Sequence, residues 1–197
     1  ATGKTADSGS GEDPAGGIWY SQDFSAVTDA STVATSTNAQ QNLVIAQDDV
    51  HGNYLSFAPG LQNSRGAYMN FAGVDVTGES SYIVEFDACI TPGNNQQTYL
   101  TVKGTDFADN GGINSGTKSG YLMNLVNTAG GSTEYMLNGT TKVTIPSGEW
   151  CHYKLYVDKN RKLVSTSITG TSTGSILDKE AAAYSGEGNA AGMYMLA

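Results

Sequence analysis

Apolar and polar side chains alternate along much of the chain, and the alternation is clearest in residues 149–170. Two alternating arms there flank a polar run, Asp158, Lys159 and Asn160, which has the composition of a tight turn. Alternation with a period of two predicts strands that are buried on one face, and a short polar turn between two such arms predicts a hairpin. We therefore predict a β-hairpin in an antiparallel sheet.

Shorter alternating runs of the same kind are separated by Gly, Asn, Ser and Pro along the rest of the chain. They predict strands at residues 18–24, 43–47, 54–58, 67–71, 82–90, 97–103, 121–126, 133–137, 142–145 and 192–197. Only the short run 178–183 has a composition that suits a helix. About a dozen short strands separated by turns are typical of a two-sheet antiparallel β-sandwich, so we predict an all-β jelly roll.

The alternation also predicts on which face each of the two cysteines lies. In the strand at 82–90 the even-numbered residues form the apolar set, which places Cys89 on the other face with Glu85 and Asp87. In the first arm of the hairpin Cys151 belongs to the apolar, buried set. A disulfide between them would need a bulge or another register, so the sequence leaves open a bridge and two inert free thiols.

Length and composition fit one domain of this class. The chain has 197 residues, of which 39% are hydrophobic and only 15% charged, and it contains 25 glycines. Such a length commonly forms a single sandwich domain. Residues 1–17 are rich in Gly, Ser and acidic residues and predict a linker, so the folded module is expected to span residues 18–197. We expect a module of a longer, multimodular polypeptide; a complete small protein is the alternative.

The net charge limits the partners that the chain can have. A formal charge of -9 opposes binding to a phosphate backbone, so we expect no nucleic-acid partner. The chain contains no run of about 18 apolar residues, so we expect no membrane-spanning helix.

The residues that catalysis would need occur without their supporting motifs. The two histidines are His51, in a turn-like segment, and His152, on the hairpin, and no nucleophile elbow occurs in a strand–turn–helix context. Carboxylate pairs for glycoside hydrolysis could come from Glu85 with Asp87 or from Glu134 with Glu149. Because carboxylates on the open face of a sheet are usually solvated, we expect a protein that is not an enzyme.

Two acidic segments carry the oxygen ligands that a hard cation prefers. Asp106 and Asp109 lie in a Gly/Asn-rich segment, and Asp48 and Asp49 form a second pair. Neither segment has the twelve-residue spacing of a helix–loop–helix calcium site, and such clusters are often turns. We keep Asp106 and Asp109 as candidate ligands of a structural calcium and expect that no cofactor is required.

A sugar-binding face would combine aromatic rings with amide and lysine donors, and the predicted strands bring such residues together. In the strand at 97–103, Leu100 and Val102 face the core, which places Tyr99 and Lys103 on the opposite face. Ordinary half-exposed sheet positions would show the same pattern. The candidate ligand-binding residues are Tyr99, Lys103, Lys118, Tyr121, Lys154 and Lys162.

Three segments carry a resemblance to a known group of domains. They are Ile-Trp-Tyr-Ser-Gln-Asp-Phe at 18–24, Tyr-Ile-Val-Glu-Phe-Asp at 82–87, and Gly-Glu-Trp-Cys-His-Tyr-Lys-Leu-Tyr-Val-Asp at 148–158 with the hairpin that follows. In this order they resemble the laminin-G or concanavalin-like jelly rolls found as non-catalytic carbohydrate-binding modules on secreted bacterial polysaccharide-degrading enzymes. The lysine-bearing strands also look like the pectin-binding modules attached to pectate lyases, in which lysines pair with galacturonate carboxylates. The last strand of that family normally continues beyond Ala197.

The resemblance implies binding of plant cell-wall polysaccharide, above all pectin or homogalacturonan, by a secreted protein that targets an appended enzyme to its substrate. Lysine can pair with a carboxylate even on an acidic protein, because long-range repulsion is screened over about 8 to 10 Å at moderate salt. Three alternatives remain open: a neutral β-glycan module that uses Tyr99, Tyr121 and Trp150, a structural or adhesion domain, and a jelly-roll lyase or hydrolase.

Overall fold

The computed structural model describes residues 20–36, 42–58, 66–93, 98–108 and 119–196. Within these ranges the only helical element is a single 3-10 turn, η1 (Ala30–Thr32), and no helix is long and apolar enough to cross a membrane. The strands are β1 (Thr35–Ser36), β2 (Asn42–Asp48), β3 (Gly52–Ala58), β4 (Gly66–Asn70), β5 (Ser81–Cys89), β6 (Tyr99–Ala108), β7 (Ser119–Asn127), β8 (Glu134–Leu137), β9 (Thr141–Thr144), β10 (Trp150–Asp158), β11 (Leu163–Gly170), β12 (Gly174–Ala183) and β13 (Ala190–Leu196).

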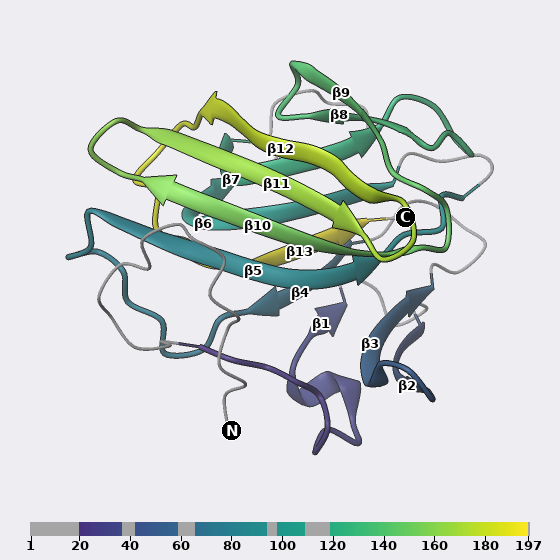
Figure 1. Ribbon diagram of the computed structural model, residues 1–197. Helices are drawn as coiled ribbons and strands as arrows, with labels where there is room; N and C mark the ends of the chain where they lie inside the picture. The colour runs from purple at the N-terminus through teal and green to yellow at the C-terminus, as the bar shows by residue number, and fades with distance from the viewer. Residues whose placement is uncertain (1–19, 37–41, 59–65, 94–97, 109–118, 197) are drawn as a thin grey trace.

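The strands form two large antiparallel sheets and one small one. The larger sheet has seven strands in the order β1-β4-β13-β6-β7-β8-β9, and the second has four in the order β12-β11-β10-β5. Figure 1 shows the four-stranded sheet as the layer nearer the viewer, with the seven-stranded sheet behind it. The hairpin β2–β3 forms the third sheet, and its Leu43 and Leu55 side chains pack against the core. The predicted all-β sandwich is thus confirmed.

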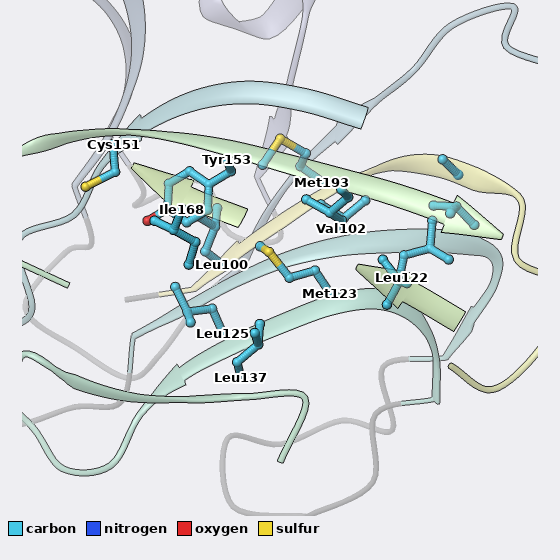
Figure 2. Packing of buried hydrophobic residues seen from close by; sticks show 14 of the residues in the cluster. Leu100, Val102, Leu122, Met123, Leu125, Leu137, Cys151, Tyr153, Ile168 and Met193 are labelled. Carbon is cyan, nitrogen blue, oxygen red and sulfur yellow. The ribbon is translucent and has the colours of Figure 1, made fainter. Parts of the chain in front are cut away.

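The core fills the space between the two large sheets. Figure 2 shows side chains from both sheets that meet there, including Leu100, Val102, Met123 and Leu125 from β6 and β7 and Tyr153 from β10. These five side chains are at most 5% exposed. Close packing of branched and aromatic side chains between two sheets is the main stabilising contribution in such a fold.

The predicted hairpin corresponds to β10 and β11, whose register places Val157 opposite Val164. Alternate residues of β10 are buried, and Cys151 lies in the buried set as predicted. Cys151 pairs with Ala88 across the sheet, whereas Cys89 pairs with Trp150 and is exposed. The two thiols therefore point to opposite faces of the sheet, and both are free.

One predicted strand was wrong in its described part, and the one run whose composition suits a helix is a strand. Residues 20–24 form no strand; instead Tyr20 packs on Phe71, with their ring centroids 5.1 Å apart, and Phe24 contacts the core from a backbone with φ 57°. The run 178–183 belongs to β12 and not to a helix, because its backbone pairs with β11. Six residues of good helix propensity are too few to nucleate a helix against a sheet edge that offers a complete ladder. Lys179, at φ 51°, lies where that ladder has an irregularity.

Lys159 holds one end of the sandwich together. From the turn after β10, its Nζ donates hydrogen bonds to the carbonyl oxygens of Val76 and Thr77 at 2.9 and 3.0 Å and to Asn189 Oδ1 at 2.7 Å. The lysine thus connects the β10–β11 turn to the segments that precede β5 and β13.

Tyr82 fixes the same end of the sandwich from inside the core. Its hydroxyl donates to the Gly188 carbonyl at 2.5 Å and accepts from the Ala190 amide at 2.9 Å. Burial raises the pKa of Tyr82 well above its ordinary value. The phenol therefore remains a neutral hydroxyl that both donates and accepts.

Candidate functional site

The outer face of the seven-stranded sheet carries aromatic rings, amide side chains and Lys103. As predicted, Leu100 and Val102 of β6 are buried in the core, and Tyr99 and Lys103 lie on the opposite face. Antiparallel pairing brings residues from the neighbouring strands into the same rows. We call this surface the Lys103 face, and it consists of Tyr68, Asn70, Tyr99, Lys103, Phe107, Tyr121, Asn124 and Tyr194.

Lys103 lies near the middle of this face, and its ammonium group has neutral neighbours. Its Nζ donates to Asn70 Oδ1 at 2.7 Å and lies 5.3 Å from the centroid of the Tyr68 ring, within cation–π distance. Among the described residues no carboxylate forms an ion pair with it. Burial lowers the pKa of Lys103 because partial desolvation penalises the charged form. The site therefore holds a half-buried cation without an anionic partner in the described structure.

Gly192 makes this position of the lysine sterically accessible. In the cross-strand row Gly192 of β13 lies between Lys103 of β6 and Asn70 of β4. A Cβ atom at residue 192 would lie 2.9 Å from Lys103 Cε. The missing side chain therefore leaves a path along which the lysine crosses the central strand to reach the amide on the far side.

Aromatic rings surround the lysine on one side. The rings of Tyr68 and Tyr194 lie 4.9 Å apart at 37°, and those of Phe107 and Tyr194 lie 5.8 Å apart at 40°. Tyr99 joins the same cluster. Tyr99 and Tyr194 are only 9% and 4% exposed, whereas the Tyr68 ring is half-buried. The two most buried rings thus support the face, whereas water reaches its other members.

Tyr121 is also placed by the sheet register, since it pairs directly with Lys103. Nearby, Thr101 Oγ1 donates to Asn124 Oδ1 at 2.8 Å, and the Asn124 backbone amide donates to Asn138 Oδ1 at 2.8 Å. The first of these bonds fixes the Asn124 side chain, and the second fixes its backbone. An ordered polar surface of this kind needs little further ordering when it binds a ligand.

The other lysine candidates lie elsewhere. Lys154 is on the outer face of the four-stranded sheet, where its Nζ lies 3.0 Å from Glu85 Oε1. Lys162 is exposed in the β10–β11 turn, at φ 53°. Lys118 lies outside the described residues, so its position relative to Lys103 stays a prediction. The structure therefore unites Tyr99, Lys103 and Tyr121 and separates Lys154 and Lys162 from them.

Each carboxylate that was considered for catalysis has a neighbour that engages it. His152 Nδ1 lies 2.9 Å from Asp87 Oδ1, and Lys142 Nζ lies 3.1 Å from Glu134 Oε1. Glu149 accepts hydrogen bonds from the Ser172 and Thr173 amides, and the bond with the Thr173 side chain is the main cause of its lowered pKa. The hydrogen bonds of Glu149 are those of a loop anchor, because they hold the turn before β12 in place.

The metal candidates are only partly described. Asp106 is exposed near the end of β6, whereas Asp109 lies outside the described residues. In the second pair, Asp48 accepts hydrogen bonds from the Val50 and His51 amides, which is the geometry of a turn. No group of three or more His, Cys, Asp or Glu in the described ranges could hold a metal ion. A structural calcium at Asp106 and Asp109 stays a prediction.

Five members of the Lys103 face were not among the ligand-binding candidates from the sequence: Tyr68, Asn70, Phe107, Asn124 and Tyr194. The runs at 67–71 and 192–197 were predicted as strands, and both are present as β4 and β13. Their neighbours in the sheet are nevertheless strands far away in the sequence, and periodicity contains no information on strand order. The pairing of β13 with both β4 and β6 brings Tyr68, Asn70 and Tyr194 to the same face as Lys103. Phe107 lies in β6 itself, beyond the end of the predicted strand, and Asn124 lies in β7, which pairs with β6.

Comparisons with known proteins identify the fold of this chain but assign it to no family. No protein-family model matches the chain. No curated protein matches it in sequence. A seed lectin of Lotus tetragonolobus superposes with a TM-score of 0.51 and 13% identity over 83% of this chain and 85% of that chain. Lectin II from Ulex europaeus superposes with a TM-score of 0.45 and 11% identity over 83% of this chain and 82% of its own. The likeness to the Lotus lectin shows that the fold is a jelly-roll β-sandwich.

Proposed function

We propose that this protein is a non-catalytic carbohydrate-binding module and that its ligand binds on the Lys103 face. The observation that carries the proposal is the half-buried Lys103 ammonium, which has an amide oxygen and an aromatic ring as neighbours and no carboxylate partner among the described residues. An ammonium group has three donors, and the bond to Asn70 uses one of them. A ligand oxygen would satisfy the others.

Three features favour a sugar over other small ligands. The face combines aromatic rings with amide and hydroxyl groups held in fixed positions, which is how a polar, ring-shaped ligand is recognised. The site lies along a sheet surface, where an extended polymer can lie across several strands. The Lotus protein that shares the fold is a lectin, which supports sugar as the ligand class.

Within the sugars we propose an acidic plant cell-wall polysaccharide, most directly homogalacturonan. A galacturonate carboxylate would complete the coordination of Lys103 with a charge-assisted hydrogen bond and would favour its protonated form. The net charge of -9 opposes a polyanion at long range, but screening within about 8 to 10 Å lets the local cation dominate at contact. We further propose that the module is secreted and targets an appended enzyme to this substrate.

The test is affinity gel electrophoresis of the wild type, Lys103→Met and Lys162→Met in gels that contain homogalacturonan. Both variants lose one positive charge, but only Lys103 lies on the face. Loss of one charge-assisted hydrogen bond of about 1.5 to 3 kcal/mol predicts roughly 10- to 100-fold weaker retention of Lys103→Met. We expect Lys162→Met to match the wild type and high salt to weaken wild-type retention.

Two results would contradict the proposal. If both variants bind homogalacturonan as the wild type does, Lys103 is not part of the site. If the wild type is retarded by no acidic or neutral polysaccharide, the protein is not a carbohydrate-binding module, and a structural or adhesion role is favoured.

A further inference from the structure

A second polar and aromatic surface lies on the opposite side of the molecule. Alternate residues of β10 point out of the four-stranded sheet: Trp150, His152, Lys154 and Tyr156. At about 3.3 Å per residue, this row extends for roughly 20 Å along the sheet. We call it the β10 stripe. In Figure 1 it belongs to the layer nearer the viewer, with β5 and β11 on either side of β10.

The side chains of the β10 stripe are partly or fully accessible to solvent. Tyr156 is 39% exposed and is one of three large apolar side chains that the described part of the chain exposes. The side chain of Lys154 is 43% exposed. At the other end, Trp150 is half-buried, stacks on His51 with centroids 4.5 Å apart, and meets Tyr54 edge-on at 5.3 Å. Tyr156 therefore supplies the exposed ring, whereas contacts with His51 and Tyr54 fix Trp150.

Between the two rings lies an ordered set of hydrogen-bonding groups. His152 Nδ1 lies 2.9 Å from Asp87 Oδ1, and Lys154 Nζ lies 3.0 Å from Glu85 Oε1. Glu85 also lies 3.7 Å from His152 Nε2. A carboxylate has about four acceptor sites, so pairing leaves Glu85 able to accept from hydroxyl groups. The pairs hold these groups in place at the exposed surface.

The charges of the β10 stripe select against an acidic ligand. Among the described residues of the stripe and its ion pairs, Asp87 and Glu85 carry two negative charges and Lys154 carries the one permanent positive charge. The whole chain also has an excess of acidic residues. These charges would repel a polyanion. A neutral, hydroxyl-rich chain could bind the hydrogen-bond acceptors and donors of the stripe and stack on the exposed Tyr156 ring. The stripe and the Lys103 face thus differ in the ligand charge that they favour.

We infer that the β10 stripe is a second glycan-binding surface, specific for neutral, extended polysaccharides and independent of the Lys103 face. Tyr156 stacks on a sugar ring, and Glu85, Lys154 and His152 bond the hydroxyl groups beside it. Two faces on opposite sides of one sandwich would let a single module bind two different polysaccharide chains of a mixed matrix.

The experiment measures retention of the wild type, Tyr156→Ala, Tyr156→Phe and Lys103→Met in gels that contain mixed-linkage β-glucan, glucomannan or homogalacturonan. Loss of the ring should weaken retention by a neutral polymer roughly 10- to 100-fold, since burial of an aromatic side chain is worth about 1.5 to 3 kcal/mol. Tyr156→Phe keeps the ring and should retain most of the binding. Urea unfolding midpoints show that each variant is folded. We expect neutral binding to be insensitive to salt and unaffected by Lys103→Met.

The outcomes separate this inference from the proposed function. If the protein does not bind homogalacturonan but its binding to a neutral polysaccharide depends on Tyr156, the β10 stripe is confirmed as a binding surface and the assignment of Lys103 to an acidic ligand is wrong. The inference is overturned if the wild type binds no neutral polysaccharide, if Tyr156→Ala binds as the wild type does, or if Lys103→Met abolishes neutral binding as well. It is also overturned if light scattering shows a dimer that Tyr156→Ala converts to a monomer, because the stripe is then an interface between two copies.

Discussion

Replacement of Lys159 by methionine should destabilise the fold far more than replacement of any exposed lysine. The Lys159 ammonium makes three hydrogen bonds of 2.7 to 3.0 Å, to Val76, Thr77 and Asn189, and methionine keeps the length of the side chain but makes none of them. A hydrogen bond to a charged group contributes about 1.5 to 3 kcal/mol when water is excluded. Because the bond to Thr77 is exposed, it contributes least. We expect the free energy of unfolding to fall by about 2 to 4 kcal/mol in total.

The assay is equilibrium urea unfolding followed by tryptophan fluorescence. Thermal unfolding gives a second readout. For a domain of this size, each kcal/mol of stability corresponds to about 2 to 4 °C in Tm, so the Tm of Lys159→Met should be roughly 5 to 15 °C lower than that of the wild type. Lys162→Met is the matched control, since it removes an exposed lysine from the same turn and should change stability by less than about 0.5 kcal/mol. If the two variants unfold at the same urea concentration, the hydrogen bonds of Lys159 do not hold this end of the sandwich together.

Three further predictions concern buried hydroxyls, an ion pair and the thiols. Tyr135→Phe should leave the free energy of unfolding unchanged or raise it, because the hydroxyl is buried with no hydrogen-bond partner among the described residues and burial raises its pKa to about 12. Tyr82→Phe instead loses two hydrogen bonds and should lower the free energy of unfolding by about 1 to 3 kcal/mol in urea unfolding. Equal changes in stability for the two variants would contradict this. The hydrogen bond to Asp87 raises the pKa of His152, so the protonated ring stabilises the fold at low pH and this contribution is lost as pH rises through that pKa. Asp87→Asn should lower the His152 pKa in an NMR titration, and it should destabilise the protein more at about pH 5 than at about pH 8.5; a gap independent of pH would refute the assignment. A thiol reagent should modify only Cys89 in the native protein and a second thiol after unfolding, and a native protein without reactive thiol would show the geometry to be wrong.

The fold could be predicted from the sequence because the alternation of buried and exposed residues along a strand involves only neighbouring residues. Along β10 the alternation predicted the buried set that contains Cys151, and along β5 it placed Cys89 on the other face, as the structure has them. Composition is a poor guide where local propensity and strand pairing disagree. The run 178–183 has the composition of a helix, yet β11 provides a ladder that a short helix cannot match in stability.

The candidate site could be predicted only in part, because its composition depends on the order of the strands in the sheet. Parity within β6 put Tyr99 and Lys103 on one face, and the pairing with β7 added Tyr121. Tyr194 lies on β13 and Asn70 on β4, and both come to the same face as Lys103 because β13 pairs with β4 on one side and with β6 on the other. These three strands come from distant parts of the chain. Alternation gives the face of a residue but not the neighbour of its strand, so Lys103 and Lys154 could not be assigned to different sheets.

The central claim is that carbohydrate binds on the Lys103 face, and NMR mapping with oligogalacturonides tests it most directly. We predict that the amide signals of β4, β6 and β13 around Asn70, Lys103 and Gly192 shift as ligand is added, and that the shifts become much smaller in Lys103→Met. No shifts at saturating ligand, or shifts confined to other strands and unchanged in Lys103→Met, would contradict the account.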